Sequence, residues 1–309
     1  MEGLKLNMNE FRYRRLNEFL IEKFGEKTLK ICIDGGFTCP NRDGKVSTGG
    51  CIFCSERGSG EHLSHTHNIT KQVQDFFASY KAERANKFIA YFQNFTNTYD
   101  TIPNLKAKYD AALIDDRIVA LAIATRPDCI NKEVIQLLKS YSNKYYVWVE
   151  LGLQTANDDT AKFINRGYSS KDFTDSVKLL NDAGIDVVTH IMVGLPNETM
   201  DDLKNTVNFL NHHNIQGLKI HSTYVVKNTV LSDLYEKGEY EPISFDDYME
   251  CLVYILTHIS PDIVVHRISG DSPKDLLVAP SWCLHKKWVM NGLNHMLPER
   301  GLWQGMYYV

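Results

Sequence analysis

The sequence predicts an α/β fold in which six βα units form a barrel or part of one. Short β-rich runs alternate with stretches whose apolar residues recur at helical spacing. The runs VALAIA and VWVELGL are apolar at consecutive positions, as in strands of a parallel sheet that is covered on both faces. The 309 residues carry no internal repeat and no Gly/Ser/Pro-rich linker, which favours one large domain with short extensions.

The predicted elements alternate along the chain. The strands are expected at 28–33, 88–93, 118–125, 146–153, 187–193 and 218–226. Between the last strands, a helix is expected behind a Ser170 cap, with Phe173, Val177 and Leu180 on one face and Gly184 after its end. A second helix is expected behind a threonine cap in the segment 199–210. In such folds the chemistry gathers where strands end, so the residues after each strand are the candidates for function.

Composition narrows the class of protein. The longest unbroken apolar run, 118–124, is seven residues long, whereas a membrane-spanning helix needs about 20. The N-terminus shows no apolar core followed by a cleavage site, so no secretory signal is visible. We therefore expect a soluble, cytoplasmic protein with no membrane partner, in a compartment where disulfides are disfavoured.

Charge is unevenly distributed. The net charge of −4 argues against nucleic-acid binding driven by bulk charge. However, residues 12–30 carry six Lys and Arg against three Glu, and residues 281–309 carry three against one. The two ends are therefore basic and remain candidates for a local contact with nucleic acid.

Three of the seven cysteines lie together in the loop after the first strand. Cys39, Cys51 and Cys54 have the spacing C-x₁₁-C-x₂-C, beside the pairs Gly35-Gly36 and Gly49-Gly50. Three thiolates leave one metal position open, whereas structural zinc and ferredoxin-type clusters usually take four protein ligands. The remaining cysteines are scattered and are expected to be core residues: Cys32, Cys129, Cys251 and Cys283.

Two other interpretations of the cysteines stay open. In the first, a zinc knuckle takes its fourth ligand from His62, His65 or His67, although these histidines also fit a solvated loop. In the second, C-x₂-C is a redox pair, but that motif normally opens a helix directly after a strand without a third cysteine upstream.

The cysteine loop and the motifs that follow it resemble the radical S-adenosylmethionine (SAM) superfamily, in particular bacterial elongator-like proteins in a short form without an acetyltransferase domain. The matching segments cover almost the whole chain: YFQ (91–93), TNTY (96–99), ATRPD (124–128), ELGLQ (150–154), INRG (164–167), HIMVGLP (190–196), KIH (219–221) and HRISGD (266–271). The resemblance implies a partial (β/α)6 radical-SAM barrel at 28–226 with a cluster loop at 36–60. An N-terminal helical extension would occupy 1–27, and a C-terminal helical extension at 227–309 would pack on the barrel.

The resemblance also implies the cofactors. Cys39, Cys51 and Cys54 would hold a [4Fe–4S] cluster, whose fourth iron binds SAM and cleaves it to a 5′-deoxyadenosyl radical. Gln154 and Arg166, twelve residues apart, would hold the SAM carboxylate. The remaining expected cofactor contacts are Gln93, Glu150 near the ribose in place of the acid that related proteins have at Ala124, and Gly194 in a GLPNET turn near the adenine.

Two of these expectations also follow from the residues themselves. Asn197 replaces the glycine that is usual in this turn, and asparagine tolerates positive φ, so the turn is expected to survive. Glu150 lies in an apolar strand, where an unpaired carboxylate is costly, so it is expected to have a partner.

The leading substrate implied by the resemblance is the wobble uridine of tRNA, with conversion of its carboxymethylaminomethyl group to aminomethyl. Substrate-pocket and catalytic candidates are Arg126, Asp128, His221, Arg267 and Asp271, each of which also fits a structural ion pair. The expected RNA contacts are Arg12, Arg14, Arg15, Lys286 and Lys287, with Trp282 and Trp288 stacking on bases. An electron donor such as flavodoxin or ferredoxin is expected, and a methyltransferase acting downstream is a further partner to consider.

Two alternative functions stay open at this point. A radical SAM enzyme acting on a small molecule or peptide is mildly favoured by the negative net charge. A zinc-stabilised nucleic-acid-binding protein without catalysis would follow if the cysteines bound zinc instead.

Overall fold

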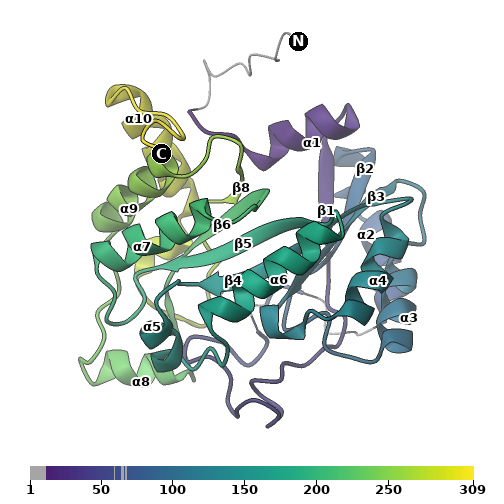
Figure 1. Ribbon diagram of the computed structural model, residues 1–309, viewed down its shortest axis with the longest axis horizontal. Coiled ribbons are helices and arrows are strands. Elements are labelled where there is room, and N and C mark those ends of the chain that lie inside the picture. The colour runs from purple at the N-terminus through teal and green to yellow at the C-terminus, as the bar shows by residue number, and fades with distance from the viewer. Residues whose placement is uncertain (1–11, 59, 64–65, 67) are drawn as a thin grey trace.

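The computed structural model describes residues 12–58, 60–63, 66 and 68–309. Within that part of the chain, a curled seven-stranded parallel sheet has the order β1-β2-β3-β4-β5-β6-β8 (Figure 1). Its strands are β1 (Thr28–Ile33), β2 (Lys87–Phe92), β3 (Ile118–Thr125), β4 (Tyr146–Gln154), β5 (Asp186–Val193), β6 (Gly217–Ser222) and β8 (Val264–Arg267). A small antiparallel sheet pairs β7 (Val225–Val226) with β9 (Leu277–Ala279).

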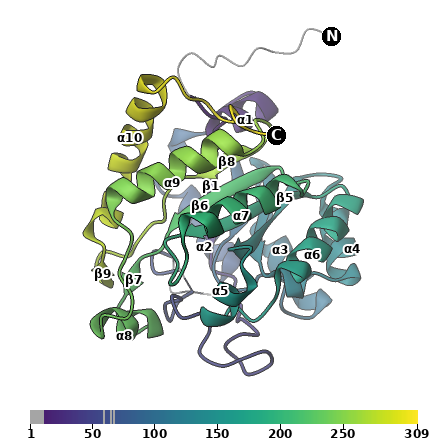
Figure 2. The ribbon, with the colours of Figure 1, turned by 60° about the vertical axis from the view of Figure 1, so that its left-hand side comes forward.

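Helices connect the strands and cover the outer face of the sheet (Figures 1 and 2). The α-helices are α1 (Leu16–Phe24), α2 (Ile69–Phe77), α3 (Ile102–Ala112), α4 (Lys132–Tyr141), α5 (Asp158–Phe163), α6 (Ser170–Asp182), α7 (Met200–Asn211), α8 (Val230–Glu236), α9 (Phe245–His258) and α10 (Lys286–Glu299). Short 3-10 helices are η1 (Ala82–Arg84), η2 (Pro127–Cys129) and η3 (Ser281–Leu284). The main apolar core lies between the sheet and these helices.

The α/β partial-barrel prediction is confirmed, and so are its helix caps to within one residue. The N-cap of α6 is Ser169 rather than Ser170, with a capping box between Ser169 and Asp172. The N-cap of α7 is Thr199 as expected, and its capping box pairs that threonine with Asp202. These caps supply acceptors for backbone N–H groups that have no partner inside the helix.

The sheet has one more strand than predicted. β8 follows α9 and pairs with β6, so the segment 227–309, expected to be helical, contributes a strand to the main sheet. The expected strand 218–226 is also two strands, because the chain leaves the sheet after Ser222 and resumes at β7. β8 is only four residues long and carries His266 and Arg267, so it lacks the apolar run that marks the other strands.

The two ends of the described chain meet at the gap between the sheet edges β1 and β8. α1 packs its Leu20 against a second apolar cluster, on the opposite face of the sheet from the main core. Just before α1, Arg15 forms a single parallel bridge with Val265 of β8. Gln304 accepts a hydrogen bond from the Arg14 amide at 2.8 Å, which ties the C-terminal segment to the same place. The half-barrel is thus bounded at its gap by α1 and not by further strand pairing.

A search of the described residues for membrane-spanning helices finds none of sufficient length and apolar character.

Candidate functional site

The clustered cysteines line a cavity at the carboxyl ends of the strands. Cys39, Cys51 and Cys54 lie in the long loop after β1, which runs beneath the sheet at the lower edge of Figure 1. They share this cavity of about 230 Å³ with residues at or just after the carboxyl ends of β2, β3, β4 and β6, among them Gln93, Arg126, Gln154 and His221. We call it the inner cavity. Residues far apart in the sequence therefore converge where parallel-barrel folds place their chemistry.

The cysteine loop is held in shape by Arg42 and by glycines. The Arg42 guanidinium donates to the main-chain oxygens of Cys54, at 3.1 Å, and Ser55. Gly50 has φ +82°, and a Cβ there would lie 2.9 Å from Arg42 Nε. A side chain at this position would therefore disturb both the turn and the arginine that wraps it.

Two of the three thiols have polar neighbours that donate toward sulfur. Asn41 Nδ2 lies 3.7 Å from Cys51 Sγ, and Arg126 Nη1 lies 3.9 Å from Cys39 Sγ. Burial raises the pKa of Cys51 to about 12. Three adjacent thiolates in this site would need a cationic group between them.

The zinc interpretation is poorly supported by the geometry. Within the described ranges, no three His, Cys, Asp or Glu side chains are arranged to hold a single metal ion. His62 is exposed and lies near Gln93, with 3.2 Å between their Nε2 atoms, while His65 and His67 lie outside the described residues. A cluster differs from a single ion because several irons spread the three thiolates apart.

The INRG segment docks onto the cysteine loop. Asn165, at φ +53°, donates through Nδ2 to the Gly50 oxygen at 2.7 Å, and its own carbonyl accepts from Asn41 Nδ2 at 2.5 Å. Gly167 has φ +80°, and a Cβ there would lie 2.6 Å from Asn41 Oδ1. The motif therefore clamps the loop that carries the cysteines.

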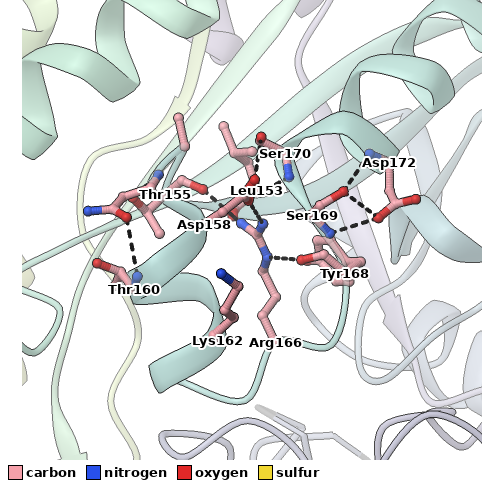
Figure 3. Close-up of polar contacts among 12 residues, drawn as sticks. Leu153, Thr155, Asp158, Thr160, Lys162, Arg166, Tyr168, Ser169, Ser170 and Asp172 are labelled. Atoms are coloured by element: carbon pink, nitrogen blue, oxygen red, sulfur yellow. Dashed lines mark hydrogen bonds and ion pairs between the residues drawn. The ribbon is translucent and has the colours of Figure 1, made fainter.

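Arg166 points away from the inner cavity, contrary to the expected contact with the SAM carboxylate. Figure 3 shows its guanidinium turned to main-chain oxygens: Nη1 donates to Leu153 and, at 2.7 Å, to Thr155, and Nε donates to Tyr168 at 3.1 Å. Nη2 pairs with Asp158 at 3.2 Å, and Arg166 is fully buried. The guanidinium N–H groups therefore donate to oxygens in and around the turn after β4, and Arg166 does not line the inner cavity.

Gln154, the other residue expected to hold the SAM carboxylate, faces the inner cavity. It lines the inner cavity at the end of β4 with φ +59°, and its Oε1 accepts from the Tyr168 hydroxyl at 2.9 Å. A Cβ at Gly152 would lie 2.5 Å from Gln154 Nε2, so the glycine makes room for the folded-back amide. Its amide nitrogen is free to turn toward a ligand.

Glu150 is buried inside a charged cluster on the floor of the inner cavity. Its Oε2 accepts from Tyr91 Oη at 2.7 Å, from His190 Nε2 at 2.9 Å and from Lys219 Nζ. Its Oε1 accepts from Trp148 Nε1 at 3.1 Å and lies 3.5 Å from Lys30 Nζ. The predicted partner is thus present, but both carboxylate oxygens are engaged, which leaves little capacity for ribose hydroxyls.

The protonation states within this cluster follow from its contacts. Burial alone would raise the pKa of Glu150, but the Lys219 and Lys30 ammonium groups hold it well below its usual value. Burial, with the nearby Lys219 ammonium, lowers the pKa of His190 to about 4, so its neutral ring donates to the carboxylate. The sequence motifs alone assign no role to Lys219. The signal for its role is a lysine within an apolar strand, where a buried ammonium needs a partner.

The remaining expected cofactor contacts divide. Gln93 lines the inner cavity. Gly194, at φ +82°, does not: a Cβ there would lie 2.8 Å from Ile243, so its space is taken by a neighbouring side chain. The turn that follows survives as predicted, because Asn197 adopts φ +64°.

Most of the expected substrate residues line the inner cavity. Arg126, His221, Arg267 and Asp271 do, whereas Asp128 stands behind Arg126 and binds its guanidinium at 2.7 and 2.9 Å. Arg267 Nη2 pairs with Asp271 at 3.1 Å. His221 is buried among cations, which lowers its pKa well below the usual value, and its Nε2 has no hydrogen-bond partner among the described residues.

The expected RNA face is only partly available. Trp282 is 8% exposed and donates Nε1 to the Ile243 carbonyl at 3.2 Å, so the prediction that it stacks on a base is wrong. Trp288 is 53% exposed and stacks on His285. Arg14 donates to the Asp262 carbonyl at 2.9 Å, Arg15 pairs with Glu18, and Lys286 pairs with Asp271 at 2.8 Å.

The inner cavity is suited to a polar ligand beside a metal cluster. Thr96 Oγ1 and His221 Nε2 are buried in residues of its lining without a partner, a cost that a polar ligand would remove. The thiols stand at one side and the Gln154 amide at another. The donor set therefore fits a three-cysteine cluster with SAM next to it.

Comparison with known proteins identifies the family. The model of the radical SAM superfamily matches residues 41–210, and the radical SAM C-terminal domain matches residues 215–299. The chain is 40% identical over 301 residues to the YtqA protein of Bacillus subtilis, which covers 97% of this chain and 94% of that relative.

Elongator-type proteins are also similar. The tRNA uridine(34) acetyltransferase of Methanocaldococcus jannaschii is 32% identical over 168 residues, 53% of this chain but only 30% of that protein. Among solved structures, the archaeal Elp3 of Methanocaldococcus infernus superposes with a TM-score of 0.69 at 19% identity, covering 90% of this chain and 64% of the Elp3 chain. These matches exclude the alternative of a zinc-stabilised binding protein without catalysis. This chain belongs to the radical SAM superfamily, as an enzyme with an Elp3-like barrel.

Proposed function

We propose that the protein is a tRNA-modifying enzyme that converts the carboxymethylaminomethyl group of a wobble uridine to aminomethyl, with SAM as the two-electron oxidant, water cleaving the oxidised C–N bond and the two-carbon unit leaving as glyoxylate. The observation that carries the proposal is the similarity to a relative named for uridine 34 of tRNA, which extends over 53% of this chain. The radical SAM family uses a [4Fe–4S] cluster and SAM, which together supply a 5′-deoxyadenosyl radical that abstracts hydrogen from a substrate.

In this proposal Cys39, Cys51 and Cys54 hold the cluster. The Arg42 and Asn165 contacts fix the loop before a ligand arrives, so little ordering is needed on binding. Asn41 and Arg126 donate toward the sulfurs, and such hydrogen bonds are among the features that set a cluster's potential.

Gln93 and Gln154 are the proposed contacts for SAM, because both side chains line the inner cavity. Arg166, Glu150 and Gly194 support the SAM site without touching SAM in this proposal. Arg166 holds the turn after β4, Glu150 neutralises buried lysines, and the missing side chain of Gly194 leaves room for Ile243. His221, Arg267 and Asp271 line the same cavity and are the proposed substrate contacts, and Arg126, held by Asp128, supports Cys39.

The proposal extends to partners and location. Arg12, Lys287 and the exposed Trp288 would contact the RNA. Arg14, Arg15 and Lys286, which also form contacts within the protein, would join them. A flavodoxin or ferredoxin would supply the electron, and a methyltransferase would act on the aminomethyl product. We place the enzyme in the cytoplasm, where its substrate would be.

The test is an anaerobic assay of the reconstituted protein with SAM, a reductant and tRNA that carries carboxymethylaminomethyluridine. We expect about four irons per chain, as for one [4Fe–4S] cluster. We also expect aminomethyluridine and 5′-deoxyadenosine as products by mass spectrometry of the nucleosides. SAM cleavage that is stimulated by a small metabolite or peptide and indifferent to tRNA would instead select the other substrate class.

A further inference from the structure

A second, larger cavity opens from the inner cavity at the gap between the sheet edges. It has a volume of about 590 Å³, within the size range of ligand sites, and lies among α1, β1, β8 and α10. We call it the lateral cavity. Figures 1 and 2 show α1 beside β1 and β8 at this end of the molecule. The residues that line both cavities are Tyr91, Gln93, Lys219, Arg267 and Asp271.

The lateral cavity is lined by more cations than anions. The positively charged side chains of its lining are Arg15, Lys30, Lys219, Arg267 and Lys286, whereas Asp271 is its one carboxylate among the described residues. Two further carboxylates stand behind the wall: Glu18 pairs with Arg15, and Glu150 pairs with Lys219. The cations that line the cavity therefore outnumber these three carboxylates by two, so the cavity favours an anion.

Lys30 is the cation with the most unused capacity. Its ammonium is 3.5 Å from Glu150 Oε1, beyond the length of a good hydrogen bond, and lies 4.6 Å from the centre of the Tyr91 ring. That carboxylate already accepts from Trp148, Tyr91, His190 and Lys219. The N–H donors of Lys30 are therefore available for a ligand.

Arg267 shares its counter-ion. It pairs with Asp271 through Nη2, and Asp271 Oδ1 also accepts from Lys286 at 2.8 Å. One carboxylate thus serves two cations. Because Arg267 lines both cavities, a group bound to its guanidinium would lie where the lateral cavity meets the inner one.

Much of the remaining wall is apolar, although polar side chains such as Asn17 and Ser269 interrupt it, and this argues for an anion carried on an organic body. Leu16, Leu20, Val265, Ile268 and Met290 supply this surface. The Lys30 and Arg267 side chains are only 21% and 30% exposed, so the charge is recessed and a flexible arm suits it better than a backbone phosphate.

We propose that the lateral cavity binds a carboxylate of the substrate through Lys30 and Arg267 and so selects the carboxylated form of the modified base. This inference rests on the proposed function, because the carboxymethyl arm is the group that would enter. The same contacts would repel the cationic aminomethyl product, which favours its release.

The test compares two RNAs that differ only in charge at this arm. One anticodon stem-loop carries carboxymethylaminomethyluridine and the other carries its methyl ester. With SAM-loaded holoenzyme, the Lys30→Gln and Arg267→Gln variants should each bind the carboxylate RNA roughly 10- to 100-fold more weakly. Their affinity for the ester should not fall below that of the wild type, because an ester has no carboxylate for these residues to bind.

Controls separate a carboxylate contact from a phosphate contact and from misfolding. A phosphate contact would weaken both RNAs equally and reduce the salt dependence of binding. Lys30→Arg keeps the charge and should retain selectivity. Lys139→Gln, on the exposed face of α4, should match the wild type for both RNAs. Equal affinity of the Gln variants and the wild type for the carboxylate RNA would overturn the subsite.

A second probe tests the subsite if the RNA is not a substrate at all. Trifluoroacetate, followed by ¹⁹F NMR with SAM bound, should show saturable line broadening with the wild type and none with the Lys30→Gln, Arg267→Gln double variant. Trifluoroacetamide should show none with either protein. Conversion of the RNA without selectivity would reject the subsite alone, whereas trifluoroacetate binding without any conversion would reject the proposed function alone.

Discussion

The two cavities are built in opposite ways. Around the inner cavity, the charged and amide groups that shape the loops are already paired inside the protein: Arg42 with loop carbonyls, Asn165 with Gly50, and Arg166 with the turn after β4. Around the lateral cavity, Lys30 has no close hydrogen-bond acceptor among the described residues, since Glu150 Oε1 lies 3.5 Å away, and Asp271 is shared between two cations. The cofactor end is thus rigid before binding, and the other end keeps its interaction energy for a ligand.

The largest effect is expected from the loss of a cluster cysteine at the inner cavity. Cys51→Ala should remove the bound iron and abolish SAM cleavage, because two thiols cannot hold the cluster against loss. Iron content, the visible spectrum and 5′-deoxyadenosine formation measure this. Cys251→Ala, on α9 and away from both cavities, is the matched control and should retain all three. Normal iron content in Cys51→Ala would refute the assignment of the cluster.

The next effect lies on the wall that both cavities share. Lys219→Met should destabilise the fold by about 3–5 kcal/mol, because it leaves the Glu150 carboxylate buried without its closest cation. Urea unfolding of the apoprotein measures the change. The double variant Lys219→Met, Glu150→Gln should recover most of the loss, and failure to recover it would mean that Lys219 stabilises through packing alone.

Arg166 tests whether the inner region is rigid for structural reasons. Arg166→Lys should cost about 2–3 kcal/mol of stability, because one ammonium cannot span the carbonyls that the guanidinium fork reaches. It should leave the KM for SAM unchanged. Gln154→Ala should do the reverse, raising the KM for SAM with little change in stability, and a raised KM in Arg166→Lys would restore the original expectation of direct contact.

The smallest effect is a pH dependence next to the inner region. Burial raises the pKa of Glu198 to about 7. The folded protein therefore holds a proton that the unfolded chain releases above its normal pKa of about 4.3, and stability falls as pH rises through 7. The stability advantage of Glu198→Gln over the wild type should be about 2 kcal/mol larger at pH 8 than at pH 5. If the difference in melting temperature between Glu198→Gln and the wild type were the same at both pH values, the raised pKa of Glu198 would be refuted.

The sequence predicted what depends on local pattern. The strand starting at Thr28 and the strand ending at Thr125 were placed to the residue, because both are apolar runs flanked by polar loops. The Thr199 cap and the positive φ of Asn197 followed equally from local chemistry. The cysteine trio was visible because C-x₂-C spacing reflects a single turn of chain.

What the sequence did not predict depends on tertiary pairing. The spacing of Gln154 and Arg166 suggested a shared ligand, but the direction of a guanidinium depends on which carbonyls the fold brings near it. The burial of Trp282 depends on its packing against Tyr248, and β8 is a strand only because β6 offers it an edge. The cation excess of the lateral cavity likewise arises from segments distant in sequence.

The way Gln304 joins three segments has a practical consequence. Its side chain accepts from the Arg14 amide and donates to the carbonyls of Ser260 and Ile263, both at 2.8 Å. The gap of the half-barrel is therefore closed by a few reversible contacts and by the single bridge between Arg15 and Val265 of β8. A single substitution at Gln304 would therefore break all three of these contacts at once.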